Sequence, residues 1–184
     1  MTPKQAARRR QQAGYTLIEL IIASAVGLMV MAALTSVVLT TVLAANTATS
    51  RVEASAQVRN FQLTAYDDFA LARPPVISGC GSPASPCTTQ SMVLQGSRMP
   101  NQSSGVAAPY AATYRWDPIL HQVTRSVGGA SRVTATGVVA YSWYIDNTGD
   151  HPSVVVSMTV TVGFYNTSYS ESQTLRFYPR VTAP

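Results

Sequence analysis

The chain has 184 residues, nearly half of them apolar, which is enough to build one compact domain with a core of its own. Its formal charge is +5, but Lys4, Arg8, Arg9 and Arg10 lie near the N-terminus with no acidic residue among them, and subtracting these four leaves +1 for the remainder. A strongly basic protein that coats nucleic acid is therefore disfavoured.

The first predicted element is a basic leader, residues 1–14, followed by a long apolar segment. No charged residue occurs between Leu20 and Ser50, and the run from Leu20 to Leu34 is long and apolar enough to cross a bilayer as a helix. The basic residues of the leader are expected to stay in the cytoplasm, which directs the rest of the chain to the periplasm or the cell exterior.

A motif lies where the leader meets the apolar segment. Residues 13–19 read Ala-Gly-Tyr-Thr-Leu-Ile-Glu, so that a single carboxylate, that of Glu19, stands at the start of an apolar helix. A charge in that setting is costly without a partner. An ordinary secretory signal peptide would have a shorter apolar run with its cleavage site after it, whereas here the motif precedes the apolar run.

This motif resembles the leader signal of type IV prepilins, minor pilins and type II secretion pseudopilins. The resemblance implies that a prepilin peptidase cuts after Gly14 and methylates the new N-terminus at Tyr15. It also implies that Glu19 serves filament assembly, because its carboxylate can pair with the freed ammonium of Tyr15 on the same or a neighbouring subunit. The family usually has Phe where this chain has Tyr15, and a helix-bending proline of major pilins is replaced by Ser36, which favours a minor subunit. A plain membrane anchor with an isolated glutamate is the alternative.

One continuous helix is expected from Thr16 to about Leu71, within a helical segment assigned to residues 15–73. Residues 15–45 form its membrane-spanning or filament-core part, and residues 46–73 its amphipathic part, where apolar and polar residues are interleaved without glycine or proline. The sequence Arg73-Pro74-Pro75 ends the helix.

Residues 74–184 are predicted to form a globular β-sheet head with a loop-rich start. The stretch from Pro74 to Pro109 is rich in Gly, Pro, Ser and Gln, and only Met92–Leu94 is expected to be a short strand within it. Cys80 and Cys87, the only cysteines, predict a disulfide in an exported protein. Two free thiols are the alternative, whereas a structural zinc site would need four ligands and neither histidine is near the pair in sequence.

The remainder of the head is predicted to be β-structure. Five strands are expected: Ala112–Trp116, Leu120–Val127, Gly137–Asp146, Ser153–Phe164 and Ser172–Tyr178. The fourth is expected to be a half-buried strand with two different faces. One face is formed by Val154, Val156, Met158, Val160 and Val162, and the other by Val155, Ser157, Thr159 and Thr161. The fold class is therefore α+β and pilin-like, with a long hydrophobic N-terminal helix packed against an antiparallel sheet. The spacing of the head also resembles W-type minor pilins (PilW-like) and J-type pseudopilins, from which no functional residue is carried over.

No catalytic, metal-binding or cofactor-binding motif is predicted. His121 is expected in a strand and His151 in a turn, and neither has a nucleophile placed beside it. Asp67 and Asp68 are expected on the helix, paired with Arg59 or Arg73.

The leading hypothesis is a minor type IV pilin, a structural subunit rather than an enzyme, that helps to start pilus assembly and lies at or near the pilus tip. It would support adhesion, twitching motility or DNA uptake, spanning the inner membrane once with its head in the periplasm before it reaches the pilus or cell surface. Its partners would be prepilin peptidase, other major and minor pilins and the inner-membrane assembly platform. The alternatives are a type II secretion pseudopilin and a head that binds DNA or a surface ligand through Arg115, Arg125 and Arg132, although the low mature charge predicts weak nucleic-acid binding at most.

Overall fold

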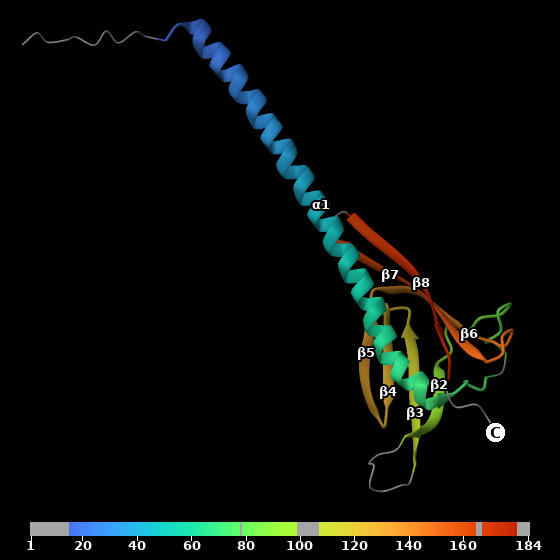
Figure 1. Ribbon diagram of the computed structural model, residues 1–184. Coiled ribbons are helices and arrows are strands. Elements are labelled where there is room, and N and C mark those ends of the chain that lie inside the picture. The colour runs from blue at the N-terminus through green and yellow to red at the C-terminus, as the bar shows by residue number, and fades with distance from the viewer. Residues whose placement is uncertain (1–14, 78, 99–106, 165–166, 180–184) are drawn as a thin grey trace, which may run out of the picture. The chain divides into compact units, whose positions relative to one another are not determined.

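The computed structural model describes residues 15–77, 79–98, 107–164 and 167–179. The chain divides into two units, Met1–Ala44 and Ala45–Pro184. The described part begins with a single helix, α1 (Leu17–Leu71), which contributes residues to both units (Figure 1).

Apart from Glu19, the α1 residues of the first unit have apolar or hydroxyl side chains. The hydroxyls of Ser24, Thr35, Thr40 and Thr41 donate to backbone carbonyls three or four residues earlier, at 2.7–3.0 Å. Such local bonds let serine and threonine occupy a helix without an unsatisfied polar group. The helix of 55 residues is long and apolar enough, by length and composition, to cross a membrane.

The second unit contains two antiparallel sheets. The first has the order β1-β2-β3-β4-β5, with β1 (Ala72–Arg73), β2 (Met92–Arg98), β3 (Ala108–Asp117), β4 (Gln122–Val127) and β5 (Ala130–Thr136). The second has the order β6-β7-β8, with β6 (Val138–Asp146), β7 (Ser153–Phe164) and β8 (Thr167–Phe177). The α1 residues of this unit lie against both sheets, as Figure 1 shows.

The core of the second unit is built on one face of α1. Ala54, Val58, Phe61, Ala65 and Phe69 recur at intervals of three or four residues, which places them along one side of a helix, and all five are buried. The ring of Phe61 meets Tyr114 of β3 at 5.6 Å and Tyr141 of β6 at 6.2 Å between centroids, in edge-to-face geometry. One aromatic side chain therefore joins the helix to both sheets.

The end of α1 is tied closely to the first sheet. Ala72 of β1 pairs with Gly96 of β2, and a Cβ atom on Gly96 would lie 1.9 Å from the carbonyl oxygen of Leu71. Only glycine therefore lets the chain leave the helix at this point and enter the sheet at once.

The α+β class, the long helix and its packing on antiparallel strands are confirmed, but several strand predictions are wrong. The strand β5 was not expected, β2 is longer than Met92–Leu94, β3 begins at Ala108 inside the predicted loop region, and β8 begins at Thr167 rather than Ser172. His121 lies in the turn before β4, with a positive φ of 49°, and not in a strand. Val155, expected on the outer face of β7, is as buried as its neighbours Val154 and Val156.

Candidate functional site

The described part of the N-terminal motif is a helix start. The backbone N–H of Glu19 donates to the Thr16 hydroxyl at 3.3 Å, and the Glu19 carboxylate accepts the backbone N–H of Thr16 at 3.4 Å. This reciprocal arrangement is a capping box, which satisfies donors that the first turn of a helix leaves unpaired. Gly14 lies outside the described residues, and the Tyr15 side chain is 85% exposed.

The capping box places the Glu19 carboxylate toward the N-terminal side of its own helix. Thr16 is adjacent to Tyr15, so the carboxylate lies on the side of the helix from which the chain enters. The spacing Thr-x-x-Glu was present in the sequence, but its capping role was not recognised there.

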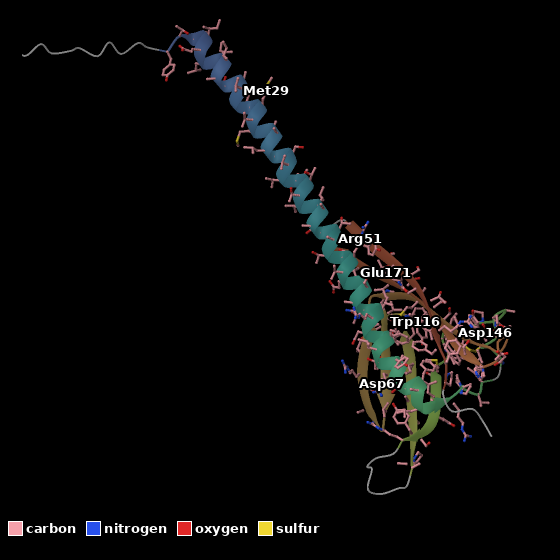
Figure 2. The ribbon with its side chains drawn as sticks, in the orientation of Figure 1. Met29, Arg51, Asp67, Trp116, Asp146 and Glu171 are labelled. Carbon is pink, nitrogen blue, oxygen red and sulfur yellow. A yellow bond between two sulfur atoms is a disulfide. The ribbon has the colours of Figure 1, made fainter. Side chains whose placement is uncertain are left out.

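An apolar exterior continues along α1 after Glu19. Every side chain from Tyr15 to Ala44 is exposed, and the large apolar ones run from Leu17 to Leu43. Figure 2 shows these side chains around the helix, with Met29 labelled. An apolar surface of this extent is not stable in water and requires lipid or protein around it.

The disulfide expected between Cys80 and Cys87 is present in the structure, with an S–S distance of 2.03 Å. Its loop adds backbone pairing to β6: the N–H groups of Trp143 and Ile145 donate to the carbonyls of Cys87 and Gly81 at 2.9 and 2.8 Å. The loop therefore acts as a short extra strand along β6, a role that the spacing of the cysteines alone did not indicate.

Asp68 is a buried charged side chain of the second unit. Its carboxylate accepts two hydrogen bonds from the Arg125 guanidinium, at 2.6 and 2.7 Å, and one each from the hydroxyls of Tyr110 and Tyr114. Burial by itself raises the pKa of the Asp68 carboxyl, but these hydrogen bonds outweigh burial and hold that pKa below its usual value. The pairing expected with Arg59 or Arg73 is wrong, because Arg125 from the facing sheet reaches the carboxylate instead.

The arginines considered for ligand binding do not form one surface. Arg125 is committed to Asp68, and Arg132 lies directly opposite it on β5. Arg115 follows Tyr114 on β3, and since successive strand residues point to opposite faces, Arg115 lies on the other side of the sheet. A nucleic-acid site built from these three side chains is therefore not supported.

The two histidines are exposed, His121 in the turn before β4 and His151 between β6 and β7. Within the described residues, no group of three or more His, Cys, Asp or Glu side chains is placed to hold a metal ion.

A family model for the prokaryotic N-terminal methylation motif matches residues 9–35. The match spans the leader junction, the capping box and the first part of the apolar helix. No curated protein and no solved structure matches the chain. The chain thus carries the N-terminal methylation motif of prokaryotic prepilin-like proteins, and the match supports a type IV pilin-like or pseudopilin protein.

Proposed function

We propose that this chain is a minor type IV pilin, a structural subunit that is processed by prepilin peptidase and takes part in starting pilus assembly. The observation that carries the proposal is the methylation motif at residues 9–35 joined to a capped, apolar helix. Cleavage follows Gly14, and the new N-terminus at Tyr15 is methylated. The head then lies in the periplasm, and later on the pilus or cell surface.

The charge of Glu19 gives the motif a physical role in assembly. A carboxylate inside an apolar environment requires a partner of opposite charge, and cleavage after Gly14 creates one in the ammonium of Tyr15. The capping box supports this pairing, because it holds the carboxylate near Thr16, the residue after Tyr15. The Glu19 carboxylate can also pair with the Tyr15 ammonium of a neighbouring subunit. Docking of that subunit would then neutralise the Glu19 charge.

The partners in this proposal are prepilin peptidase, other major and minor pilins that pack against α1, and the inner-membrane assembly platform. Ser36, in place of a helix-bending proline, favours a minor subunit, and the PilW-like spacing of the head agrees with it. A type II secretion pseudopilin would use the same leader and helix. Deletion of the gene separates the two functions, since loss of pili without loss of protein secretion supports the pilus role, and the reverse supports secretion.

The experiment that tests the proposal is N-terminal mass spectrometry of the protein from cells with and without an active prepilin peptidase. The expected mature chain begins at N-methylated Tyr15 only in cells that contain the enzyme. If the leader remains in both strains, or if cleavage falls after the apolar run, the proposal is wrong. The protein would then be a plain anchored or secreted domain.

A further inference from the structure

The head covers α1 only from Asn46 onward. Asn46 and Thr47 are half-buried and Ser50 is buried, whereas residues 15–45 are all exposed. The β7–β8 hairpin lies beside this part of the helix, as Figure 1 shows. The first cover of α1 by the head therefore comes directly after the long apolar segment, with no spacer between them.

The length of α1 places this part of the head at a membrane surface. A bilayer with its headgroup layers is about 40–45 Å thick. At about 1.5 Å per residue, Asn46 lies about 40 Å along the helix from Glu19, and Arg51 lies about 48 Å from it. When α1 crosses the membrane with Glu19 at the cytoplasmic side, Asn46 reaches the outer headgroup layer and Arg51 lies at the outer limit of that layer.

The β7–β8 hairpin has a composition that suits a headgroup layer. No charged residue occurs in β7, or in β8 before Glu171, so the sequence from Ser153 to Ser170 is uncharged. Gly163 and Ser168, which pair with each other across the hairpin, are both exposed. Small uncharged residues can enter the headgroup layer without the cost of removing a charge from water.

Arg51 is the first charged residue after Glu19, and it lies beside the hairpin (Figure 2). Its guanidinium is 5.3 Å from the centre of the Tyr169 ring, and because Tyr169 packs against the core, this contact holds the guanidinium in place. Helical side chains lean toward the N-terminus, which for Arg51 is the direction of the membrane. Among the described residues, Arg51 forms no ion pair.

The partner of Arg51 is argued from its position and not from net charge, because two carboxylates lie within a few residues of it. Glu171 accepts hydrogen bonds from Ser55 and Gln173, and Glu53 lies two positions along the helix, about 200° around it. An arginine at the headgroup layer meets lipid phosphates, with which a guanidinium forms strong bidentate hydrogen bonds.

We propose that Gly163, Ser168 and Tyr169 of the hairpin sit on the outer headgroup layer of the bilayer, and that the Arg51 guanidinium binds a lipid phosphate there. This inference rests on the proposed function in one respect, namely that α1 crosses a membrane. Seating of the head on the lipid would fix the depth of α1 in the bilayer before the subunit is assembled.

The test uses the full-length chain in nanodiscs of phosphatidylethanolamine and phosphatidylglycerol, with one chain per disc. Both native cysteines are in the disulfide, so a nitroxide label attaches selectively to Ser168→Cys. Ser131→Cys in β5 is the control label, because it lies next to the strand pair that reaches Asp68 near the other end of the head. The label at position 168 is expected to broaden the phosphorus NMR resonance of the lipid, whereas the label at position 131 is not.

Removal of the Arg51 charge should release the head from the lipid. The two components of the nitroxide spectrum give the ratio of seated to released heads. Arg51→Gln is expected to lower this ratio about fivefold, the contribution of one arginine near an anionic membrane surface, and Arg51→Lys should keep most of it. In nanodiscs of digalactosyldiacylglycerol, a lipid without phosphate, the unmodified chain should behave as Arg51→Gln does.

Arg59→Gln is the matched control for the loss of charge. Arg59 lies about 12 Å further along α1, beyond the range of the screened lipid charge at physiological salt, so its removal should leave the ratio unchanged. Absence of broadening from position 168, equal broadening from both labels, or no effect of Arg51→Gln would overturn the proposal. So would an equal effect of Arg51→Gln in the lipid without phosphate.

A second copy of the chain is the other candidate partner for this surface. If the label at position 168 becomes immobile only in discs that hold two chains, a second copy is the partner and the proposal is wrong. None of these readouts depends on leader cleavage, so their failure leaves the N-terminal mass spectrometry result unchanged.

Discussion

Asp68 is a carboxylate that the fold needs in its charged form. Four hydrogen bonds converge on it from Arg125, Tyr110 and Tyr114, and the Asp68 side chain is almost fully buried. We predict that Asp68→Asn lowers the free energy of unfolding by about 3 kcal/mol, because it leaves the Arg125 charge without a partner at a largely buried site. The measurement is denaturant unfolding of the chain in detergent. Asp67→Asn, at the exposed neighbouring position, should change stability by less than about 0.5 kcal/mol.

The pH dependence of unfolding follows from the same site. The pKa of Asp68 is lower in the folded chain than its usual value near 4, so its stabilising contribution is complete above that value and disappears as the pH falls through the folded pKa. The difference in stability between the native chain and Asp68→Asn should therefore be largest at neutral pH and shrink in acid. A difference that stays constant down to about pH 2 would contradict the charged pairing.

At the scale of elements, the disulfide loop and β6 form one unit. Reduction of Cys80–Cys87 releases the loop, and we predict that the amides of Trp143 and Ile145, which donate to it, then exchange faster with solvent. Closing a loop of this length stabilises a fold by about 2 to 3 kcal/mol, mainly through the unfolded chain. Hydrogen exchange of the oxidised and reduced chains checks the expectation. The central strand β7 supplies control amides, and equal acceleration there would indicate general loosening instead of release of one edge.

Sequence patterns predicted the bounds of two elements well. The β-rich run Ser153–Phe164 matches β7, although the buried Val155 breaks the predicted alternation, and the absence of glycine and proline in the segment before Arg73 predicted where α1 ends. The strand β5 was missed because only Thr134 and Ala135 are buried in it, although Gly128-Gly129, both with positive φ, marks the two-residue hairpin turn before it.

The partner of Asp68 was assigned wrongly for a different reason. Arg59 and Arg73 are close to Asp68 along the chain, so local spacing favoured them as partners. Arg125 is 57 residues away in the sequence, and it reaches Asp68 only because β4 packs against α1. The contact between Ser55 of α1 and Glu171 of β8 is likewise a product of packing, because the two residues are 116 positions apart in the sequence. Distances of this kind are set by tertiary structure, and a single sequence carries no direct record of them.

At the scale of the whole molecule, the proposed role in a filament depends on one charge. We predict that Glu19→Ala leaves membrane insertion and leader cleavage intact but abolishes incorporation into filaments, because the freed ammonium of Tyr15 then has no carboxylate to neutralise it in an apolar environment. Immunoblots of sheared surface filaments and of membranes measure the two pools. Glu53→Ala, an exposed carboxylate on the same helix, should assemble normally. Normal assembly of Glu19→Ala would mean that Glu19 serves only as the partner of Thr16 at the helix start.

The hydroxyls of α1 have a further consequence for the proposed move of this helix from a membrane into a filament. Ser24, Thr35, Thr40 and Thr41 donate to carbonyls of their own helix and so hold their polar groups in place without help from neighbours. Moving from fluid lipid into a packed protein bundle, or back, would exchange no hydrogen bond at these four positions. The passage that we propose between the two environments therefore carries no cost for unsatisfied hydroxyls at these four positions.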